Sequence, residues 1–125
     1  MSLTVKYNAQ RGFVESTLSG IVSPAELDQE MVQAAAMSQE YACELFLSDF
    51  QDAEVGFSIL DVFELPDLQD NAGLKKQTAR IALLPPRSKP GMTLARDYEI
   101  ACMSRGWAVC AFVDRQKALV WLLHN

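Results

Sequence analysis

The sequence lacks the features that mark membrane proteins, disulfide-rich proteins and common cofactor enzymes. No apolar run approaches the roughly 18–20 residues that a membrane-spanning helix needs. The first residues show no basic patch followed by an apolar stretch, so no secretory signal is expected. The three cysteines are scattered among apolar residues with no Cys-x-x-Cys pair. This pattern predicts reduced thiols in a cytoplasmic protein.

Catalytic and metal-binding motifs are also lacking. The chain has no G-x-G-x-x-G segment and no Walker loop, and its only histidine, His124, has no cysteine or carboxylate at ligand spacing. Asp49, Asp52 and Asp114 follow predicted strands, but no nucleophile accompanies them, so we interpret them as caps and solvated groups. We therefore expect no metal, no cofactor and no enzymatic activity.

The length and the net charge indicate a single globular domain that does not bind anionic partners through charge alone. The chain has 125 residues, of which 50% are hydrophobic and 22% are charged, as expected for one globular domain spanning residues 1–125. The net charge of −5 argues against binding to nucleic acid or to an anionic membrane through charge alone.

Hydrophobic periodicity in the first half predicts a hairpin, a helix and a strand. Residues 3–7 and 13–19 alternate apolar and polar side chains around a turn, which favours an antiparallel pair. Ser23-Pro24-Ala25-Glu26 is a capping box that begins a helix running to about Ser38. A strand is predicted over 43–48, and a loop over 51–57.

The second half alternates helix and strand. Ser58 is predicted to cap a helix over 59–65 that Pro66 interrupts, and a strand follows over 78–84. A helix over 90–105 should end at Gly106 in the left-handed conformation. A strand over 107–113 then leads to a last helix capped by Asp114. The order β-β-α-β-α-β-α-β-α predicts an α/β protein: a mixed five-stranded sheet with helices packed on it, strand one antiparallel at or near an edge and the rest largely parallel.

The same order, together with several short motifs, resembles the SpoIIAA-like (STAS/SEC14) family of small bacterial proteins. The resemblance covers nearly the whole chain, and the motifs are Gly12-Phe13, Ser19-Gly20, Asp49-Phe50, Leu65-Pro66, Arg80-Ile-Ala, Gly106-Trp107 and Phe112-Val-Asp-Arg…Ala118-Leu-Val-Trp-Leu. It implies the fold of the anti-sigma-factor antagonists and a wider kinship with lipid-carrying domains, and hence a binding module.

The resemblance also directs attention to Ser58. Anti-sigma-factor antagonists are phosphorylated on a serine at the start of the helix after the third strand, within an Asp-Ser-Ser-Gly-like motif. The corresponding segment here is Gly56-Phe57-Ser58-Ile59-Leu60, in which only Ser58 matches. Ser58 is therefore either a phosphoacceptor or a helix cap, and nearby Asp52, Glu54 and Asp61 favour the cap because they would repel a phosphate.

Two helices have more apolar residues than a single buried stripe requires. The residues of and beside these helices that are predicted to line a hydrophobic cleft or docking surface are Phe57, Leu60, Phe63, Met92, Arg96, Ile100 and Met103. A deeply covered middle helix with scattered surface methionines is the alternative.

Two functions follow as hypotheses. The first is a carrier or sensor of a small hydrophobic, lipid-like ligand, with transient association with a membrane surface. The second is a protein-interaction module of the anti-sigma-antagonist kind with a protein partner, regulated at Ser58 or not.

Overall fold

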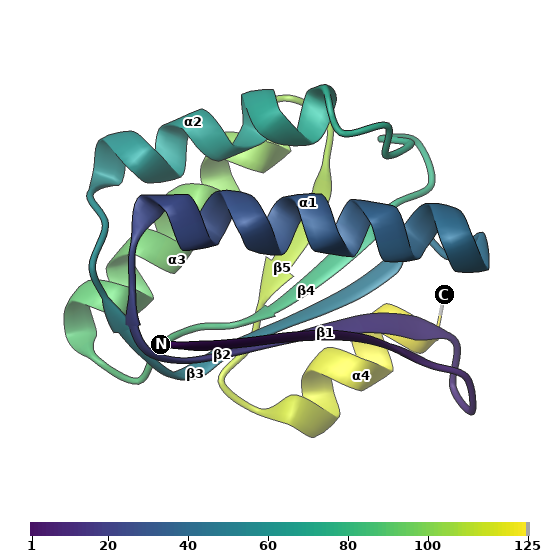
Figure 1. The fold of residues 1–125 in the computed structure, drawn as a ribbon, viewed down its shortest axis with the longest axis horizontal. Helices are drawn as coiled ribbons and strands as arrows, with labels where there is room; N and C mark the ends of the chain where they lie inside the picture. Colours follow the sequence, from purple (N-terminus) through teal and green to yellow (C-terminus); the bar gives the residue numbers. More distant parts are fainter. Residues whose placement is uncertain (125) are drawn as a thin grey trace.

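The structure is a computed structural model that describes residues 1–124 of the chain. Its elements follow the predicted order (Figure 1), and their bounds are β1 (Ser2–Asn8), β2 (Phe13–Val22), α1 (Pro24–Tyr41), β3 (Leu45–Val55), α2 (Ile59–Asp70), β4 (Arg80–Leu84), α3 (Lys89–Met103), β5 (Ala108–Ala111) and α4 (Arg115–Leu123). The Ser23 capping box and the Asp114 cap are both formed, and Gly106 has a φ of 88° just after α3. The two predicted N-caps and the left-handed conformation of Gly106 are confirmed, whereas α3 itself ends at Met103, two residues before the predicted end, with Ser104 as its C-cap.

The five strands form one sheet in the order β1-β2-β3-β4-β5. β1 pairs antiparallel with β2 at one edge, and every later pair is parallel. The predicted mixed sheet, with its antiparallel first strand, is thus confirmed.

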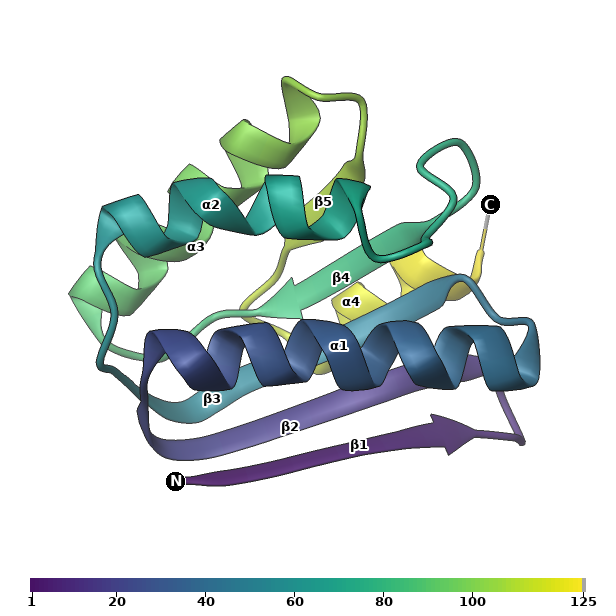
Figure 2. The same cartoon turned by 45° about the horizontal axis from the view of Figure 1, so that its top comes forward.

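Three helices cover one face of the sheet and one covers the other. The connections through α1, α2 and α3 each lead to the next strand on the same side, from β2 toward β5. Right-handed crossovers that all move across the sheet in one direction place their helices on the same face. α1, α2 and α3 therefore share a face, whereas α4 packs against β3 and β4 from behind (Figures 1 and 2). Within the shared layer, α2 makes its closest contacts with α3 and α1.

Side-chain alternation divides the core between these two faces. On β3, Phe46 and Phe50 belong to the clusters under α1 and α3, whereas Leu47 packs with Ala118 and Leu122 of α4. The thiols of Cys43 and Cys102 are buried and that of Cys110 is half-buried, all of them free.

Several elements have other bounds than the sequence predicts: β2, α1, β3 and α2 end later than predicted, whereas β4, α3 and β5 are shorter. The expected loop over 51–57 instead continues β3 to Val55, because β2 also extends to Val22 and the two strands stay paired, Gly20 with Ala53 and Val22 with Val55. The expected break at Pro66 does not occur, and α2 continues to Asp70. The ring of Pro66 is fully buried, and this burial offsets part of the cost of the lost backbone hydrogen bond.

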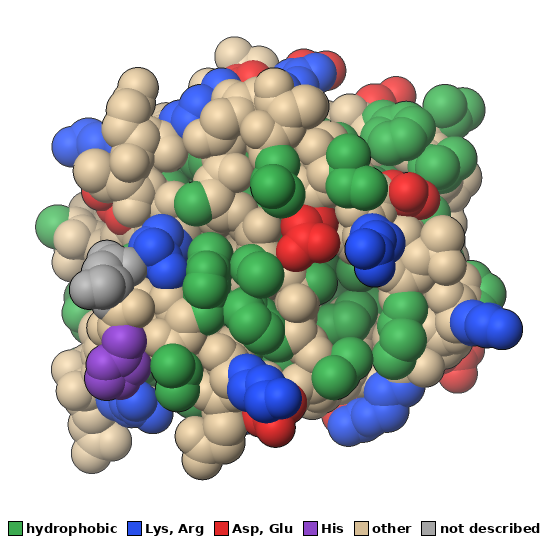
Figure 3. Space-filling model, turned by 180° about the vertical axis from the view of Figure 1, so that it is seen from behind, with side chains coloured by type: hydrophobic (Ala, Val, Ile, Leu, Met, Phe, Trp, Pro, Cys, Tyr) green, Lys and Arg blue, Asp and Glu red, His purple; other side chains and the backbone are tan. Residues whose placement is uncertain are grey.

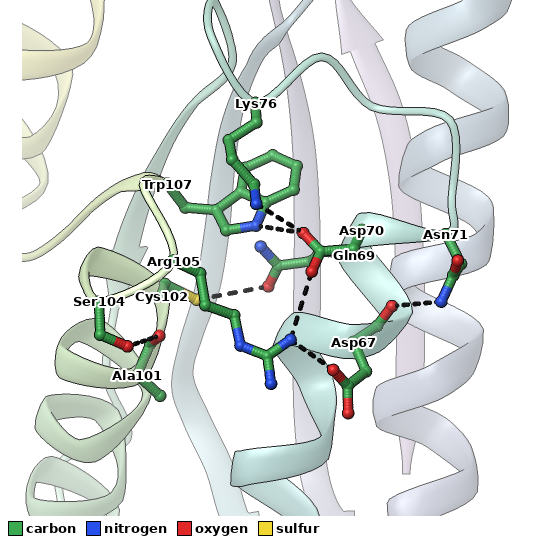
Figure 4. Close-up of polar contacts among 10 residues, drawn as sticks. All are labelled: Asp67, Gln69, Asp70, Asn71, Lys76, Ala101, Cys102, Ser104, Arg105 and Trp107. Atoms are coloured by element: carbon green, nitrogen blue, oxygen red, sulfur yellow. Dashed lines mark hydrogen bonds and ion pairs between the residues drawn. The ribbon is translucent and has the colours of Figure 1, made fainter.

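A polar cluster fixes the end of α2 to the segment between α3 and β5 (Figure 4). We call it the Asp70 clamp: Asp70 accepts hydrogen bonds from the indole N–H of Trp107 at 2.9 Å and from Arg105 at 3.2 Å, and its carboxylate lies 3.1 Å from the Lys76 ammonium. Hydrogen bonds from Lys76 and then Trp107 lower the pKa of the Asp70 carboxyl. The clamp holds one end of α2 against its neighbours.

The clamp yields a stability prediction. Asp70→Ala should lower the free energy of unfolding by about 1–3 kcal/mol, because it leaves the indole N–H of the buried Trp107 without a partner. Asp67→Ala is the control, because Asp67 pairs with Arg105 only at the surface and such pairs contribute about 0–1 kcal/mol. Urea denaturation measures both, and equal losses would contradict the role of the indole.

Candidate functional site

A cavity of about 60 Å³ lies between the sheet and the three helices on its shared face. Its walls come from α1, β3, α2, β4 and α3 and are almost entirely apolar; they include Leu27, Phe50, Val62, Leu65, Leu83 and Ala95. A second cavity of about 30 Å³ adjoins Glu30, Met31, Ser48, Ile81 and Tyr98, residues that also line the first. The first cavity therefore lies beneath α2, between α1 and α3.

Two serines make a gap in the apolar surface of the sheet beneath α1. Ser16 of β2 and Ser48 of β3 are register partners on adjacent parallel strands. Both are buried, and Ser48 lines the two cavities. Their inward neighbours are larger: Val14 and Leu18 on β2, and Phe46 and Phe50 on β3. We call this gap the serine hollow.

Glu30 of α1 lies over the serine hollow. Only 8% of its surface is exposed, and its carboxylate accepts a hydrogen bond from the Ser48 hydroxyl at 3.2 Å. Burial raises the pKa of the Glu30 carboxyl, and hydrogen bonds from Ser16 and Ser48 oppose the rise only in part. Glu30 thus brings an ionisable group into an otherwise apolar cavity.

A second buried polar group involves Tyr98, which lines both cavities together with Glu30. The Tyr98 hydroxyl donates to the side-chain oxygen of Gln69, which is itself fully buried. The Cys102 thiol donates weakly to the same oxygen, and burial raises its pKa to about 11. Cys102 is therefore a thiol at neutral pH and a poor nucleophile.

The residues predicted to bind a hydrophobic ligand do not gather in this cavity. Only Phe57 lines it. The other apolar members point away from the core and are exposed, Leu60 to 69% and Met103 to 62%, with Phe63, Met92 and Ile100 between 42% and 59%. Arg96 is exposed as well. The set describes the outer surfaces of α2 and α3 instead of the walls of an internal site.

Exposed apolar side chains are also present elsewhere. Seen from behind, the molecule shows hydrophobic side chains in several groups, separated by charged and other polar ones (Figure 3). Val120 on α4 and Val32 on α1 are examples of large exposed residues outside α2 and α3.

Ser58 caps α2. Its side chain accepts from the Asp61 backbone N–H at 3.4 Å, and the Asp61 carboxylate accepts from the Ser58 backbone at 2.7 Å and from its hydroxyl at 3.1 Å. The Ser58 hydroxyl thus lies beside the Asp61 carboxylate, which would repel a phosphate attached to it.

The carboxylates at the strand ends have structural partners. Asp114 caps α4, Asp52 pairs with Arg87 at 2.6 Å, and Asp49 accepts from the backbone of Gln51. On the α4 face, buried Glu15 pairs with Arg115 at 2.7 Å. Within residues 1–124, no group of three His, Cys, Asp or Glu is placed to hold a metal ion, and no helix is long and apolar enough to cross a membrane.

The sequence and the fold were compared with those of known proteins. No family model matches the sequence, and no curated protein matches it. Among solved structures, an uncharacterized DUF3478-family protein with a SpoIIAA-like fold from Shewanella loihica PV-4 is similar over 97% of this chain and 92% of its own, with a TM-score of 0.59 and 14% identity. The anti-sigma factor antagonist SpoIIAA in its unphosphorylated form is similar over 99% of this chain and 100% of its own, with a TM-score of 0.55 and 10% identity.

The chain therefore has the SpoIIAA-like α/β fold, and the resemblance predicted from the short motifs is confirmed at the level of fold. At 14% and 10% identity, these similarities show the fold alone, because one fold serves many functions.

Sequence reasoning missed Glu30, Ser16 and Ser48 as a group. Glu30 is a charged residue in the buried α1 stripe that also contains Leu27, Met31 and Ala34. Each serine occupies an inward position in a strand whose other inward residues are apolar. These interruptions of periodicity were visible in the sequence, but only the register of β2 against β3 brings the serines side by side.

Glu30 gives a pH prediction. The pKa of the Glu30 carboxyl is higher in the folded state than its ordinary value of 4.5. The protonated carboxyl therefore stabilises the fold at pH values below 4.5, and this stabilisation is lost as the pH rises through the folded-state pKa. Glu30→Gln should therefore unfold at a higher urea concentration than the parent at pH 8, and the difference should shrink toward pH 4. If Glu30→Gln were less stable than the parent at pH 8, the Glu30 carboxylate would have a partner in the folded protein that offsets the cost of burying its charge.

Ser58 gives a second prediction. Ser58→Ala should lower the free energy of unfolding by about 1 kcal/mol, because the N–H of Asp61 loses its cap. Ser104→Ala is a matched exposed serine that caps no helix start and should change stability less. Thermal and urea unfolding measure both, and an unchanged Ser58→Ala protein would refute the capping role.

Proposed function

We propose that the protein is a non-catalytic module that binds another protein, of the anti-sigma-factor-antagonist kind. The observation that supports this most directly is the end-to-end similarity of fold to the anti-sigma factor antagonist SpoIIAA, which spans 99% of this chain and 100% of that one. A fold shared from end to end provides the same elements for a partner to contact, although it does not by itself determine function.

The N-terminal part of α2 is the proposed contact surface. Ile59, Leu60 and Phe63, which we call the α2 patch, expose between 42% and 69% of their surface beside the capped start of the helix. Exposed apolar area is costly in water, at about 25 cal/mol per Å², and a partner that covers the patch removes that cost. Aromatic and aliphatic residues of this kind are frequent anchors of protein interfaces.

Binding is proposed to be independent of phosphorylation at Ser58. A phosphate on this hydroxyl would lie next to the Asp61 carboxylate, which already accepts from it at 3.1 Å. The favourable helix N-terminus is therefore opposed by a like charge at contact distance.

The proposal is tested with purified anti-sigma factors from the host, each titrated with the protein by isothermal calorimetry. One of them should bind, and Leu60→Ser with Phe63→Ser should weaken that binding at least tenfold, because the double variant removes the centre of the α2 patch. Val32→Ser with Val120→Ser is the matched control, since these residues are equally exposed on α1 and α4. Ser58→Ala should bind like the parent.

Two results would contradict the proposal. Failure of every anti-sigma factor to bind would remove this class of partner. Equal binding by the α2 double variant and the control would place the interface elsewhere on the fold.

The carrier of a lipid-like ligand remains a second candidate, supported by the apolar walls of the cavity. Its support is weaker, because a volume of about 60 Å³ is small for a lipid chain and only Phe57 of the seven predicted residues lines that space. A membrane contact would instead use the exposed apolar residues of α2 and α3.

A further inference from the structure

Glu30 is an exception among the buried polar side chains of this protein. Glutamate is rarely buried to this degree without a cationic partner, and Glu15, the other buried glutamate among residues 1–124, has such a partner in Arg115. The linings of the two cavities beside Glu30 contain no lysine or arginine from the described part of the chain. The hydrogen bond from Ser48 leaves further lone pairs of the carboxylate available.

We propose that the cavity binds a small primary ammonium ion with a short hydrocarbon body. The ammonium group donates to the Glu30 carboxylate above the serine hollow, and the hydrocarbon lies between the apolar walls formed by β4, α2 and α3. This site is distinct from the surface proposed to contact a protein partner, although α2 contributes residues to both.

The hydrogen-bonding groups at the site match an ammonium ion. An ammonium has three donors and no acceptor. The oxygens of Glu30 and Ser48 lie together at the cavity, because the Ser48 hydroxyl donates to the carboxylate and both residues line the space, and buried Ser16 is the register partner of Ser48. A charge-assisted hydrogen bond to a carboxylate is about twice as strong as a neutral one, and a cation would compensate the charge that burial now disfavours.

The apolar walls limit the rest of the ligand. A cavity of about 60 Å³ has room for only a few heavy atoms, since an engineered cavity of about 150 Å³ holds benzene. Phe57, Leu65 and Leu94, which line the cavity, are only half-buried, so its wall reaches the surface between α2 and α3. A short alkyl chain that extends from the hollow toward this opening fits both features.

The test uses three probes of similar size and different charge. Propylammonium chloride, 1-propanol and sodium propionate are each titrated into the 125-residue protein, and amide chemical shifts and the melting temperature are followed. Propylammonium should shift amides of α1, β2 and β3 around the hollow and raise the melting temperature at millimolar concentration. 1-Propanol and propionate should do neither to a comparable extent.

Three variants locate the site. Glu30→Gln should weaken propylammonium binding at least tenfold, whereas Glu40→Gln, an exposed glutamate of the same helix, should bind like the parent. Ser48→Val keeps the Glu30 carboxylate but fills the hollow, and it should also lose binding. Amide spectra establish that each variant is folded, so at least one of the two site variants reports on binding even if the other does not fold.

Several results would overturn the proposal. Equal binding of propylammonium and 1-propanol, retained in Glu30→Gln, would show a neutral apolar cavity. Binding unchanged in Ser48→Val would place the ammonium outside the hollow. No response to any probe would mean that water alone occupies the space beside Glu30.

Discussion

The parallel pairing of β2, β3, β4 and β5 in sequence order is the constraint on which the rest of the structure depends. Because each crossover is right-handed and leads in the same direction, α1, α2 and α3 must lie on one face. Three helices over one face cannot all lie directly on so narrow a sheet. α2 accordingly rests on α1 and α3, and the space beneath it is the cavity.

Local interactions then determine how much of this space stays open. The Asp70 clamp holds the C-terminal end of α2 against the start of β5, and the fully buried Pro66 and Gln69 fill the space near that end. Toward the other end, Val62 and Leu65 reach the cavity wall. The sheet beneath presents Ser16 and Ser48 where larger residues would close the gap. The cavity therefore results from helix placement and small strand residues together.

Much of this fold could be predicted from the sequence because its elements begin and end with local chemistry. Ser23, Ser58 and Asp114 each precede a helix with apolar residues, and each caps that helix. Gly106 adopts a left-handed conformation that few other residues tolerate. The end of β3 and the continuation of α2 depended on tertiary contacts instead. Polar residues at 51 and 52 resemble a loop until β2 is known to pair beside them, and Pro66 resembles a break until its ring is known to be buried.

The candidate site was less predictable for the same reason. Exposed apolar residues on α2 and α3 were identified from helical periodicity, but periodicity does not show which side of α2 faces a cavity. The structure shows that α2 has two different faces: Leu60 and Phe63 point outward, whereas Val62 and Leu65 line the space above the serine hollow.

Since one helix forms both the proposed contact surface and a wall of the cavity, any shift of α2 changes both together. The clamp limits such a shift at the C-terminal end of the helix. The Ser58 capping box and the packing of Phe57 and Val62 hold the N-terminal end. A protein partner bound to the α2 patch would therefore contact the end of α2 that lies farther from the clamp.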